Sequence, residues 1–383
     1  MAWNNIIGQE RVKTLLQRAI LDKKIAHAYC LIGFEGVGKD ALAIEFAKTV
    51  NCKNPVITIN GIDACNECSS CRQAKILQHP NIQLVFALPT GKKSDTKKDS
   101  PLESLSDEQS QNINEQVKLK AENPYHKIAI PDANLLKIAS IREIKRNLVL
   151  SATQQGRRCI IISRGDEMTP EAANAFLKTL EEPHDFVTII ITTSRQEAIL
   201  PTILSRCQQI KCEPLSDELI SEAVRKNMNV TLPEARLVAA FAQGSYTRAL
   251  DFLDENMKTA REVIINILRA SLKKKNFRSE LITLIESISS KKDRRNVEIL
   301  LGILLLWFRD VITYIEYKNS DRIINIDQVE AIKRFAENFM DKNIMTLMKE
   351  VETAINRIRK NVNIQLVLIK LFLSIKEEII GVN

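Results

Sequence analysis

A glycine-rich loop near the start of this 383-residue chain has the residue types and spacing that bind phosphate. It contains, in order, Gly33, Gly36, Gly38 and Lys39. Glycines let backbone N–H groups turn toward phosphate oxygens, the N-terminus of a following helix adds positive potential, and a lysine reaches the outer phosphates. The loop follows a short apolar strand and opens a helical pattern, so we predict a phosphate-binding loop. The alternative is a glycine-rich turn with a solvated lysine.

The last position of this loop departs from the pattern. A working loop carries Ser or Thr there, whose hydroxyl binds Mg²⁺, whereas this chain has Asp40. A carboxylate can hold Mg²⁺ in principle, but it places negative charge beside the β-phosphate, and its longer arm changes the geometry. Binding of ATP and Mg²⁺ therefore stays open, and we expect catalysis to be impaired more than binding.

The acidic pair that ATPases place directly after a buried strand, to hold Mg²⁺ and activate water, is also altered. The strand predicted at Cys159–Ile162 is followed by Ser163 and Arg164, so a cation stands where Mg²⁺ must be held. Asp166 and Glu167 come later, before the next helix, where their simpler role is to favour the helix N-terminus. We therefore predict that this chain does not hydrolyse ATP by itself.

Four cysteines have the spacing of a structural metal site. They are Cys52, Cys65, Cys68 and Cys71, which form the pattern C-x₁₂-C-x₂-C-x₂-C. Four thiolates suit tetrahedral Zn²⁺, and each short C-x₂-C step lets one turn present two sulfurs to the same ion. We predict a structural zinc, because four protein ligands leave no open position for catalysis. The alternative, a set of exposed reduced thiols, would be reactive.

The composition is that of an ordinary globular protein with a mild basic excess. Hydrophobic residues make up 45% of the chain, aromatic residues only 5%, and the formal net charge is +8. A charge of this size permits contact with nucleic acid but does not establish it. The first residues lack the pattern of a secretion signal, and the apolar run at 299–308 is too short to span a bilayer. We therefore expect a cytoplasmic protein with reduced cysteines and no membrane contact.

The elements that must position these residues alternate between strands and helices as far as residue 213. The expected strands lie at 28–32, 82–86, 159–162, 187–192 and 208–211, and the expected helices at 12–20, 39–50 and 170–180. The strands at 159–162 and 187–192 are β-branched runs of the type that is buried on both faces of a parallel sheet. The alternation therefore predicts an α/β domain with a parallel sheet.

Two other regions differ from this pattern. Residues 90–120 are polar and mixed in charge, so we predict a disordered insertion, with a structured recognition loop as the alternative. From 214 onward the periodicity is almost wholly helical, and strongly apolar segments occur at 297–314 and 355–375. The chain is therefore expected to continue as a small helical region at 214–255 and a larger helical domain at 256–383.

Seven short segments occur along the chain in an order that identifies a family. They are Ile7–Glu10, His27–Tyr29, Asn174–Pro183, Thr192–Ser194, Ser205–Cys207, Gly244–Leu250 and Asn361–Leu366. Together they resemble, in the same order, motifs of the AAA+ clamp-loader subunits of bacterial DNA polymerase III. The resemblance implies an AAA+ P-loop-like α/β domain over 1–213 with a zinc module at about 52–71. It also implies a helical lid over 214–255 and an all-α collar for oligomerisation over 256–383.

The resemblance also implies roles for two arginines. In the family, the arginine of the Ser205-Arg206-Cys207 motif points into the ATP site of a neighbouring subunit. Arg206 is therefore expected to act catalytically in trans as an arginine finger, with Ser205 and Cys207 beside it. The alternative is a surface arginine that pairs with a carboxylate such as Glu213. Arg248 would touch the γ-phosphate in an intact subunit, and here it is expected to bind nucleotide, to cap a helix or to be a relic.

Altered nucleotide motifs together with an intact trans-acting arginine are similar to the delta-prime type of clamp-loader subunit. Such a subunit would not hydrolyse ATP. It would help a hetero-pentamer with gamma/tau-like and delta-like subunits to load a sliding clamp on primed DNA, as part of the polymerase holoenzyme. The alternatives are an ATP-hydrolysing gamma/tau-type subunit and, from another class, a zinc-dependent nucleic-acid-binding protein. Residues 61–73 contain a single cation, Arg72, and no aromatic residue, which disfavours the last alternative.

Overall fold

The computed structural model describes the chain over residues 2–58, 61–89, 101, 105–149, 156–182, 185–253, 257–274, 276–289, 293–318, 323–360 and 362–381. The chain forms two compact units. The first consists of Met1–Leu219 and Gly244–Thr247, and the second of Ile220–Gln243 and Arg248–Asn383. Every residue that we predict for nucleotide or metal binding lies in the first unit, except Arg248, which belongs to the second.

A five-stranded parallel sheet forms the centre of the first unit. Its order is β4-β5-β6-β1-β7, and its strands are β1 (Ala28–Ile32), β4 (Ile82–Val85), β5 (Arg158–Ile162), β6 (Val187–Thr193) and β7 (Gln208–Lys211). The carboxyl end of β1 lies between two neighbours, because Ile32 pairs with Thr193 on one side and with Lys211 on the other. The predicted α/β domain with a parallel sheet is confirmed, and the glycine-rich loop leaves the sheet between β6 and β7.

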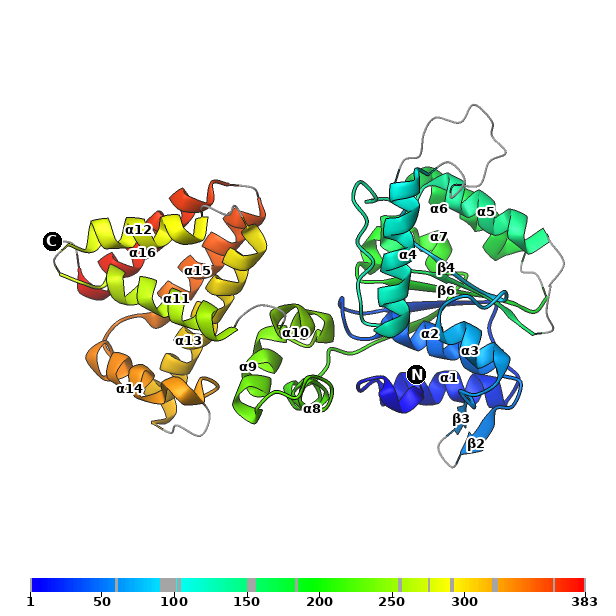
Figure 1. Ribbon diagram of the computed structural model, residues 1–383, viewed down its shortest axis with the longest axis horizontal. Coiled ribbons are helices and arrows are strands. Elements are labelled where there is room, and N and C mark those ends of the chain that lie inside the picture. The colour runs from blue at the N-terminus through cyan, green and yellow to red at the C-terminus, as the bar shows by residue number, and fades with distance from the viewer. Residues whose placement is uncertain are drawn as a thin grey trace. The chain divides into compact units, whose positions relative to one another are not determined.

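Helices cover both faces of this sheet. The helices of this unit are α1 (Glu10–Leu21), α2 (Lys39–Val50), α3 (Ser69–Lys75), α4 (Asp107–Glu122), α5 (Ile138–Val149), α6 (Pro170–Glu181) and α7 (Pro201–Leu204). Figure 1 shows α5 and α6 on one face and α1 and α2 on the other. On the first face Phe176 is fully buried in the cluster formed with β1, β5 and β6. On the second, the rings of Tyr29 from β1 and Phe46 from α2 meet edge to face, with centroids 5.5 Å apart.

Smaller elements complete the first unit. An antiparallel hairpin of β2 (Val56–Thr58) and β3 (Gly61–Asp63) lies between the first and second of the four cysteines. Single 3-10 turns occur at Trp3–Asn5, Gly165–Glu167 and Gln196–Ala198. The turn at Gly165–Glu167 is separated from β5 by Ser163 and Arg164, and it positions the two carboxylates that the altered acidic motif retains.

Helix α4 contradicts the prediction of a disordered insertion at 90–120. The prediction is wrong over Asp107–Lys120, whereas residues 90–100 and 102–104 lie outside the described part of the chain. The helix begins with a capping box, in which Gln109 N donates to Ser106 Oγ at 3.2 Å and Ser106 N donates to Gln109 Oε1 at 3.0 Å. The box gives hydrogen-bond partners to two backbone N–H groups at the start of the helix.

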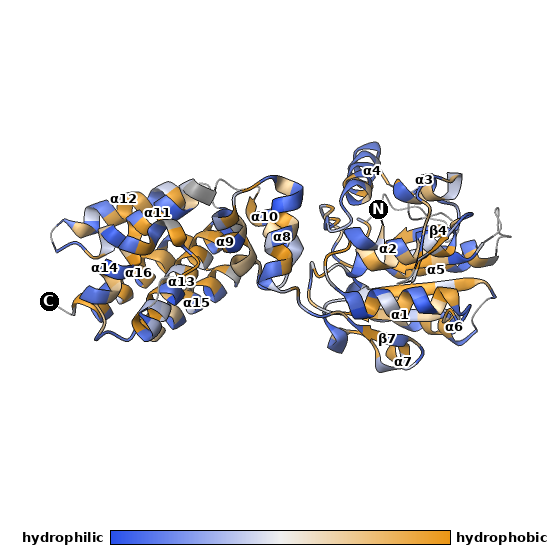
Figure 2. Ribbon diagram, turned by 90° about the horizontal axis from the view of Figure 1, so that it is seen from below, coloured by the Kyte–Doolittle hydropathy of each residue, from blue (hydrophilic) through white to orange (hydrophobic). Residues whose placement is uncertain are grey.

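Helix α4 is also anchored by a narrow apolar face. Figure 2 shows a mostly hydrophilic helix, but Ile113 is buried against Phe86, Ile128 and Ile130 in a small hydrophobic cluster. Composition alone indicated disorder because these contacts depend on the spacing of a few apolar residues and not on a high apolar content. The helix carries Lys120 in its last turn and so brings a cation to the glycine-rich loop.

The second unit is helical, as predicted for the chain beyond 214. Its helices are α8 (Asp217–Met228), α9 (Leu232–Ala242), α10 (Tyr246–Leu253), α11 (Met257–Ser271), α12 (Phe277–Ser289), α13 (Arg294–Tyr317), α14 (Val329–Asn338), α15 (Ile344–Arg359) and α16 (Ile364–Ile380). The first residues of α8 and α10 belong to the first unit. A 3-10 turn lies at Ile326–Gln328. Helix α13 contacts α9, α11, α14 and α15. Gly302 permits the close approach of α9, because a Cβ atom there would lie 2.3 Å from Phe241 Cε2.

The apolar segment at 355–375 belongs to two helices. Asn363 begins the second of them, because its Oδ1 accepts a hydrogen bond from Leu366 N at 3.1 Å. The predicted boundary between lid and collar, at 255/256, lies outside the described residues, and this division stays a prediction. Among the residues that the structure describes, no helix is long and apolar enough to cross a membrane.

Candidate functional site

The glycine-rich loop requires glycine at two positions. Gly36 and Gly38 have φ values of +80° and +99°, which side chains rarely adopt. Other residues also crowd these positions, since a Cβ atom would lie 2.1 Å from Ser245 Oγ at Gly36 and 3.0 Å from Tyr125 Oη at Gly38. The loop therefore keeps the backbone shape of a phosphate-binding loop, but other parts of the chain approach it closely.

Lys39 is bound to its own loop. Its Nζ atom donates to Gly33 O at 2.7 Å and to Phe34 O at 2.6 Å. Burial lowers the pKa of Lys39 below its ordinary value, although the neighbouring Asp40 carboxylate opposes this effect. The ammonium that would reach an outer phosphate is therefore engaged by two backbone carbonyls.

A cavity of about 320 Å³ lies over the loop and the carboxyl ends of β5 and β6. Residues from five stretches of the chain line it: the loop itself, the ends of the two strands, the end of α4 with the segment that follows it, and Thr247. Ser163 and Arg164 line it, as the altered acidic motif predicts, and so do Asp166 and Glu167. Ligands bind at this edge of many parallel sheets, because loops that follow neighbouring strands converge there.

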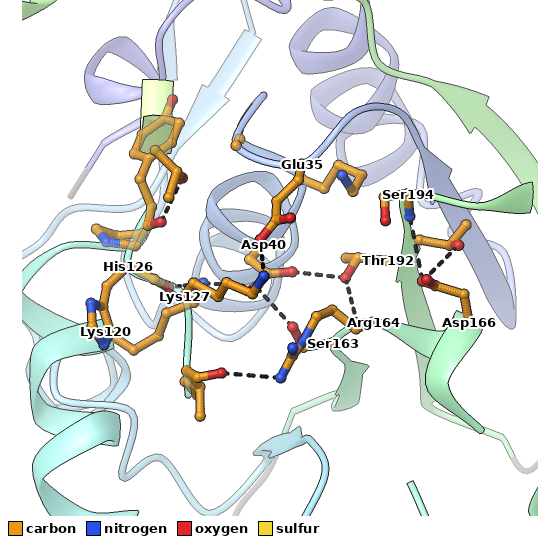
Figure 3. A pocket seen from close by; sticks show the side chains of 18 of the residues that line it. Glu35, Asp40, Lys120, His126, Lys127, Ser163, Arg164, Asp166, Thr192 and Ser194 are labelled. Atoms are coloured by element: carbon orange, nitrogen blue, oxygen red, sulfur yellow. Dashed lines mark hydrogen bonds and ion pairs between the residues drawn. The ribbon is translucent and has the colours of Figure 1, made fainter. Parts of the chain in front are cut away.

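The Asp40 carboxylate lies at the centre of this cavity's polar contacts (Figure 3). Its Oδ2 atom accepts from Lys120 Nζ at 2.7 Å and from Ser163 Oγ at 2.9 Å. Its Oδ1 atom accepts from Thr192 Oγ1 at 2.8 Å. Burial would raise the pKa of Asp40, but the Lys120 ammonium and the hydrogen bonds outweigh it and lower the pKa to about 2. Asp40 is therefore a charged carboxylate at neutral pH.

The other carboxylates that line the cavity each pair with a basic side chain. The pairs are Glu35 with Lys127 at 2.6 Å, Asp166 with Arg195 at 2.9 Å and Glu167 with Arg164 at 3.0 Å. Mg²⁺ prefers several oxygen ligands in octahedral geometry. All four cavity carboxylates already contact cations of the protein, so this set of residues does not fit Mg²⁺ as a ligand shell.

Tyr125 closes the cavity against the first residues of the chain and the segment at 244–247. Its Oη atom accepts from Ile7 N at 2.8 Å, and its carbonyl oxygen accepts from Thr247 Oγ1 at 2.8 Å. The rings of Tyr125 and Tyr246 meet edge to face at 4.9 Å. In addition, Tyr246 N donates to Gly36 O at 3.0 Å, so the segment at 244–247 is bound directly to the loop.

The Ser205-Arg206-Cys207 turn lies outside this cavity. Arg206 donates to Glu181 Oε1 at 2.8 Å and to Thr202 O at 2.9 Å, so its carboxylate partner is Glu181 and not Glu213. Ser205 Oγ donates to Thr202 O at 3.2 Å.

The neighbouring Cys207 packs against the core on the α5 and α6 face, and burial raises the pKa of its thiol to about 12. Cys207 therefore packs against the core, whereas the side chain of Arg206 is about one third exposed. Arg248, in the second unit, donates to Gln243 Oε1 at 3.1 Å and lies over the Phe241 ring.

The four cysteines come together in a compact cluster, as predicted. Their sulfur atoms all lie within 4.8 Å of one another. The distances from Cys52 to Cys65 and to Cys71 are both 3.5 Å, and the distance from Cys65 to Cys71 is 3.9 Å. Four sulfurs around one tetrahedral Zn²⁺, each at about 2.3 Å, would lie about 3.8 Å apart. The cluster therefore fits a tetrahedral ion.

Backbone N–H groups further suit this cluster to thiolates. Cys65 N donates to Cys52 Sγ at 3.2 Å, Cys68 N donates to Cys65 Sγ at 3.4 Å, and Cys71 N donates to Cys68 Sγ at 3.4 Å. Burial would raise the pKa of Cys68, but the N–H group of Cys71 and other neighbours outweigh it and lower the pKa to about 6. Such donors favour the charged sulfur that a metal binds.

A buried hydrogen-bond chain joins the cluster to the sheet. His79 Nδ1 accepts from Asn81 N at 3.0 Å, so we assign the proton to Nε2, which faces Ser70 Oγ at 2.9 Å. Ser70 in turn donates to Asn51 O at 2.6 Å, and the Asn51 side chain donates to Arg157 O, just before β5, at 2.9 Å. The cysteine loop is therefore fixed to the start of β5 through the residue that follows α2, and not only through the cysteines.

Sequence reasoning missed two residues of the site, Lys120 and Tyr125. Lys120 lies in α4, which composition had indicated to be disordered, and Tyr125 lies in the segment that follows this helix. A signal for the helix was present, because Ser106 and Gln109 have the S-x-x-Q spacing of a capping box and Ile113 follows four residues later. The pairing of Lys120 with Asp40 spans 80 positions of the chain, and no local pattern predicts it.

Residues 8–216 match the family model described as DNA polymerase III, delta subunit, and residues 255–377 match the one described as DNA polymerase III, delta subunit, C terminal. The chain is 25% identical over 369 residues to DNA polymerase III subunit delta' of Bacillus subtilis (strain 168), which covers 96% of each chain. It is 24% identical over 352 residues to subunit delta' of Buchnera aphidicola subsp. Acyrthosiphon pisum (strain APS), covering 91% of this chain and 86% of that one.

A second kind of subunit is about equally similar. DNA polymerase III subunit tau of Bacillus subtilis (strain 168) is 26% identical over 333 residues, which cover 82% of this chain and 50% of that protein. The identities to delta' and tau subunits are nearly the same, so identity alone does not distinguish the two roles.

The geometry of the cysteine cluster generates a prediction about metal content. Replacing Cys65 by Ser removes one of four ligands, so Cys65→Ser should lose bound zinc and unfold at a lower temperature, because a structural metal contributes folding free energy. Cys212→Ala is the matched control, since Cys212 is buried outside the cluster and should leave the metal in place. Elemental analysis of the purified proteins measures this, and wild-type protein without zinc would reject the site.

The Asp40 contacts generate a prediction about pH. A carboxyl group whose pKa is lowered on folding stabilises the folded state above its ordinary pKa, near 3.8, and this stabilisation is lost as the pH falls toward 2. Between pH 5 and pH 2 the free energy of unfolding should therefore fall by about 2 kcal/mol more in the wild type than in Asp40→Asn. Denaturant unfolding at several pH values measures the difference, and parallel curves for the two proteins would contradict it.

Proposed function

This chain belongs to the DNA polymerase III, delta subunit family, and on that premise we propose that it is a clamp-loader subunit of delta' type that does not hydrolyse ATP. Its part in replication would be to help neighbouring subunits load a sliding clamp on primed DNA. Two statements in this proposal go beyond the family assignment. The first is that the chain's own pocket does not hydrolyse ATP, and the second is that Arg206 acts in the ATP site of a neighbouring subunit.

The observation that supports the first statement is the pairing of every cavity carboxylate with a cation. ATP hydrolysis by P-loop ATPases needs Mg²⁺ between the β- and γ-phosphates and an acidic residue that orients water. Here Asp166 and Glu167 form ion pairs with Arg195 and Arg164, and Asp40 pairs with Lys120. The pocket therefore lacks the free carboxylates that the reaction requires in cis.

The second statement rests on the position and chemistry of Arg206. Its guanidinium is partly exposed, lies on a surface turn outside the cavity, and forms an ion pair with a half-exposed carboxylate. An ion pair of this kind contributes little stability, so a stronger anion can displace it. A guanidinium is always charged and can contact two phosphate oxygens at once, which suits it to a triphosphate on an adjacent subunit.

The cysteine cluster supports a structural role for zinc within the same subunit. Cys52, Cys65, Cys68 and Cys71 would supply four thiolates, which leaves the ion no open position for substrate. Its effect would be to fold the loop between α2 and α3 and, through Asn51 and Ser70, to hold that loop against the sheet.

The partners in this proposal are gamma/tau-like and delta-like subunits in a hetero-pentamer in the cytoplasm, together with the clamp and primed DNA. The match of residues 255–377 to the C-terminal model of the family supports the use of the second unit as the collar. The main alternative is a gamma/tau-type subunit that hydrolyses ATP. The residues at three positions argue against it. Asp40 stands where such a subunit has a hydroxyl that binds Mg²⁺, and Ser163 and Arg164 stand where it has an acidic pair.

The trans-acting role predicts a specific effect of Arg206. In a loader reconstituted with an ATPase-competent neighbour, clamp and primed DNA, Arg206→Ala should lower turnover at the neighbouring site by roughly 10³-fold, the size of arginine-finger effects in other phosphoryl-transfer systems. Assembly should be unchanged. Arg206→Lys should rescue only part of the rate, because a point charge does not reproduce the two-pronged contact.

Arg225→Ala is the control for loss of an exposed arginine on the same chain, since Arg225 lies exposed on α8. It should assemble and support turnover like the wild type. Should Arg206→Ala assemble normally and support the wild-type rate, Arg206 is a surface residue and the trans-acting role is wrong.

A further inference from the structure

Lys120 is a buried ammonium that reaches the cavity over the glycine-rich loop. Its side chain is only 4% exposed, and its Nζ atom donates to Asp40 Oδ2 at 2.7 Å and to His126 O at 2.8 Å. Figure 3 shows it reaching Asp40 from the side of α4. A lysine in the last turn of a helix is also favoured by the partial negative charge of the carbonyls at that end.

The groups around Asp40 all donate to it. One ammonium and the hydroxyls of Ser163 and Thr192 occupy both carboxylate oxygens. A metal ion needs the same oxygens as ligands and would arrive as a second cation beside Lys120. Two like charges that share one carboxylate repel each other, and burial strengthens the repulsion.

We propose that Lys120 is a resident cation that takes the place of a divalent metal ion in this pocket and thereby sets its specificity: the pocket excludes divalent cations, and with them metal-bound nucleotides. The inference deepens the proposed function and rests on it for the identity of the pocket. Missing ligands alone do not explain this exclusion. Asp40 is itself a potential metal ligand, and Lys120 keeps its carboxylate occupied.

The rest of α4 explains why Lys120 stays in place. The capping box of Ser106 and Gln109 fixes the start of the helix, and Ile113 anchors its middle in a hydrophobic cluster. The carbonyl oxygen of His126 and the carboxylate of Asp40 then hold the ammonium at its end. The other lysines and arginines that line the pocket have other partners. Lys127 pairs with Glu35, and Arg164 and Arg195 pair with the carboxylates after β5. Lys39 donates to two carbonyl oxygens of its own loop.

Removing Lys120 should therefore convert Asp40 into a metal ligand. The probe is Mn²⁺ alone, which prefers oxygen ligands over the thiolates of the cysteine cluster and is followed by the electron paramagnetic resonance signal of the free ion. Lys120→Ala should gain a saturable Mn²⁺ site that the wild type lacks. The double variant Lys120→Ala/Asp40→Asn should lose the gain, and Lys118→Ala, which removes an exposed lysine from the same helix, should behave like the wild type.

Two results would overturn the proposal. One is a wild-type protein that already binds Mn²⁺ at a site which Asp40→Asn abolishes, because a metal ion would then displace Lys120. The other is a folded Lys120→Ala protein, by circular dichroism and thermal unfolding, that gains no Asp40-dependent site. If Lys120→Ala does not fold, Lys120→Gln takes its place, because glutamine keeps a hydrogen-bond donor for Asp40 without the charge. The same gain of an Asp40-dependent Mn²⁺ site is then expected, and its absence overturns the proposal. No other subunit is needed, so this result is independent of the Arg206 assay.

Discussion

The contact between the Asp40 carboxylate and the Lys120 ammonium is the interaction on which the pocket depends. Asp40 opens α2, Lys120 ends α4, and the hydroxyls of Ser163 and Thr192 add the ends of β5 and β6. Four elements distant in sequence therefore meet at one carboxylate. A buried carboxylate without such partners would be costly, so the four elements must be placed together for the domain to be stable. Asp40 stands at the loop position where P-loop ATPases carry the Ser or Thr whose hydroxyl binds Mg²⁺.

Helix α2 joins this pocket to the cysteine cluster. Its first turn carries Lys39 and Asp40, and Cys52 follows just beyond its last residue. A helix of 12 residues spans about 18 Å and is stiff along its length. At the far end Lys48, in a buried ion pair with Glu45, donates to Asn66 Oδ1 at 2.6 Å, between two of the cysteines. A metal bound by the four cysteines would therefore also hold the helix that follows the glycine-rich loop.

The sequence predicted the parts of this arrangement that local patterns determine. The strands β1 and β6, the helix α2 and the cysteine cluster follow from β-branched runs, a glycine-rich turn and ligand spacing, each encoded within a few neighbouring residues. Helix α4 was missed because its stability comes from a capping box and one buried face rather than from composition. The partners of Asp40 and Arg206 were missed because they depend on the tertiary fold: Lys120 lies 80 residues from Asp40, and Glu181 lies 25 residues from Arg206.

We propose that this pocket has lost metal-dependent ATP chemistry and that the subunit acts in its neighbour's reaction. The most direct measurement is ATP turnover by the isolated protein, with and without Mg²⁺, for the wild type and for Lys39→Ala. The account predicts turnover at background for both proteins under both conditions, because Lys39 is bound to its own loop and the carboxylates of the pocket are paired. Turnover that requires Mg²⁺ and is abolished by Lys39→Ala would contradict it.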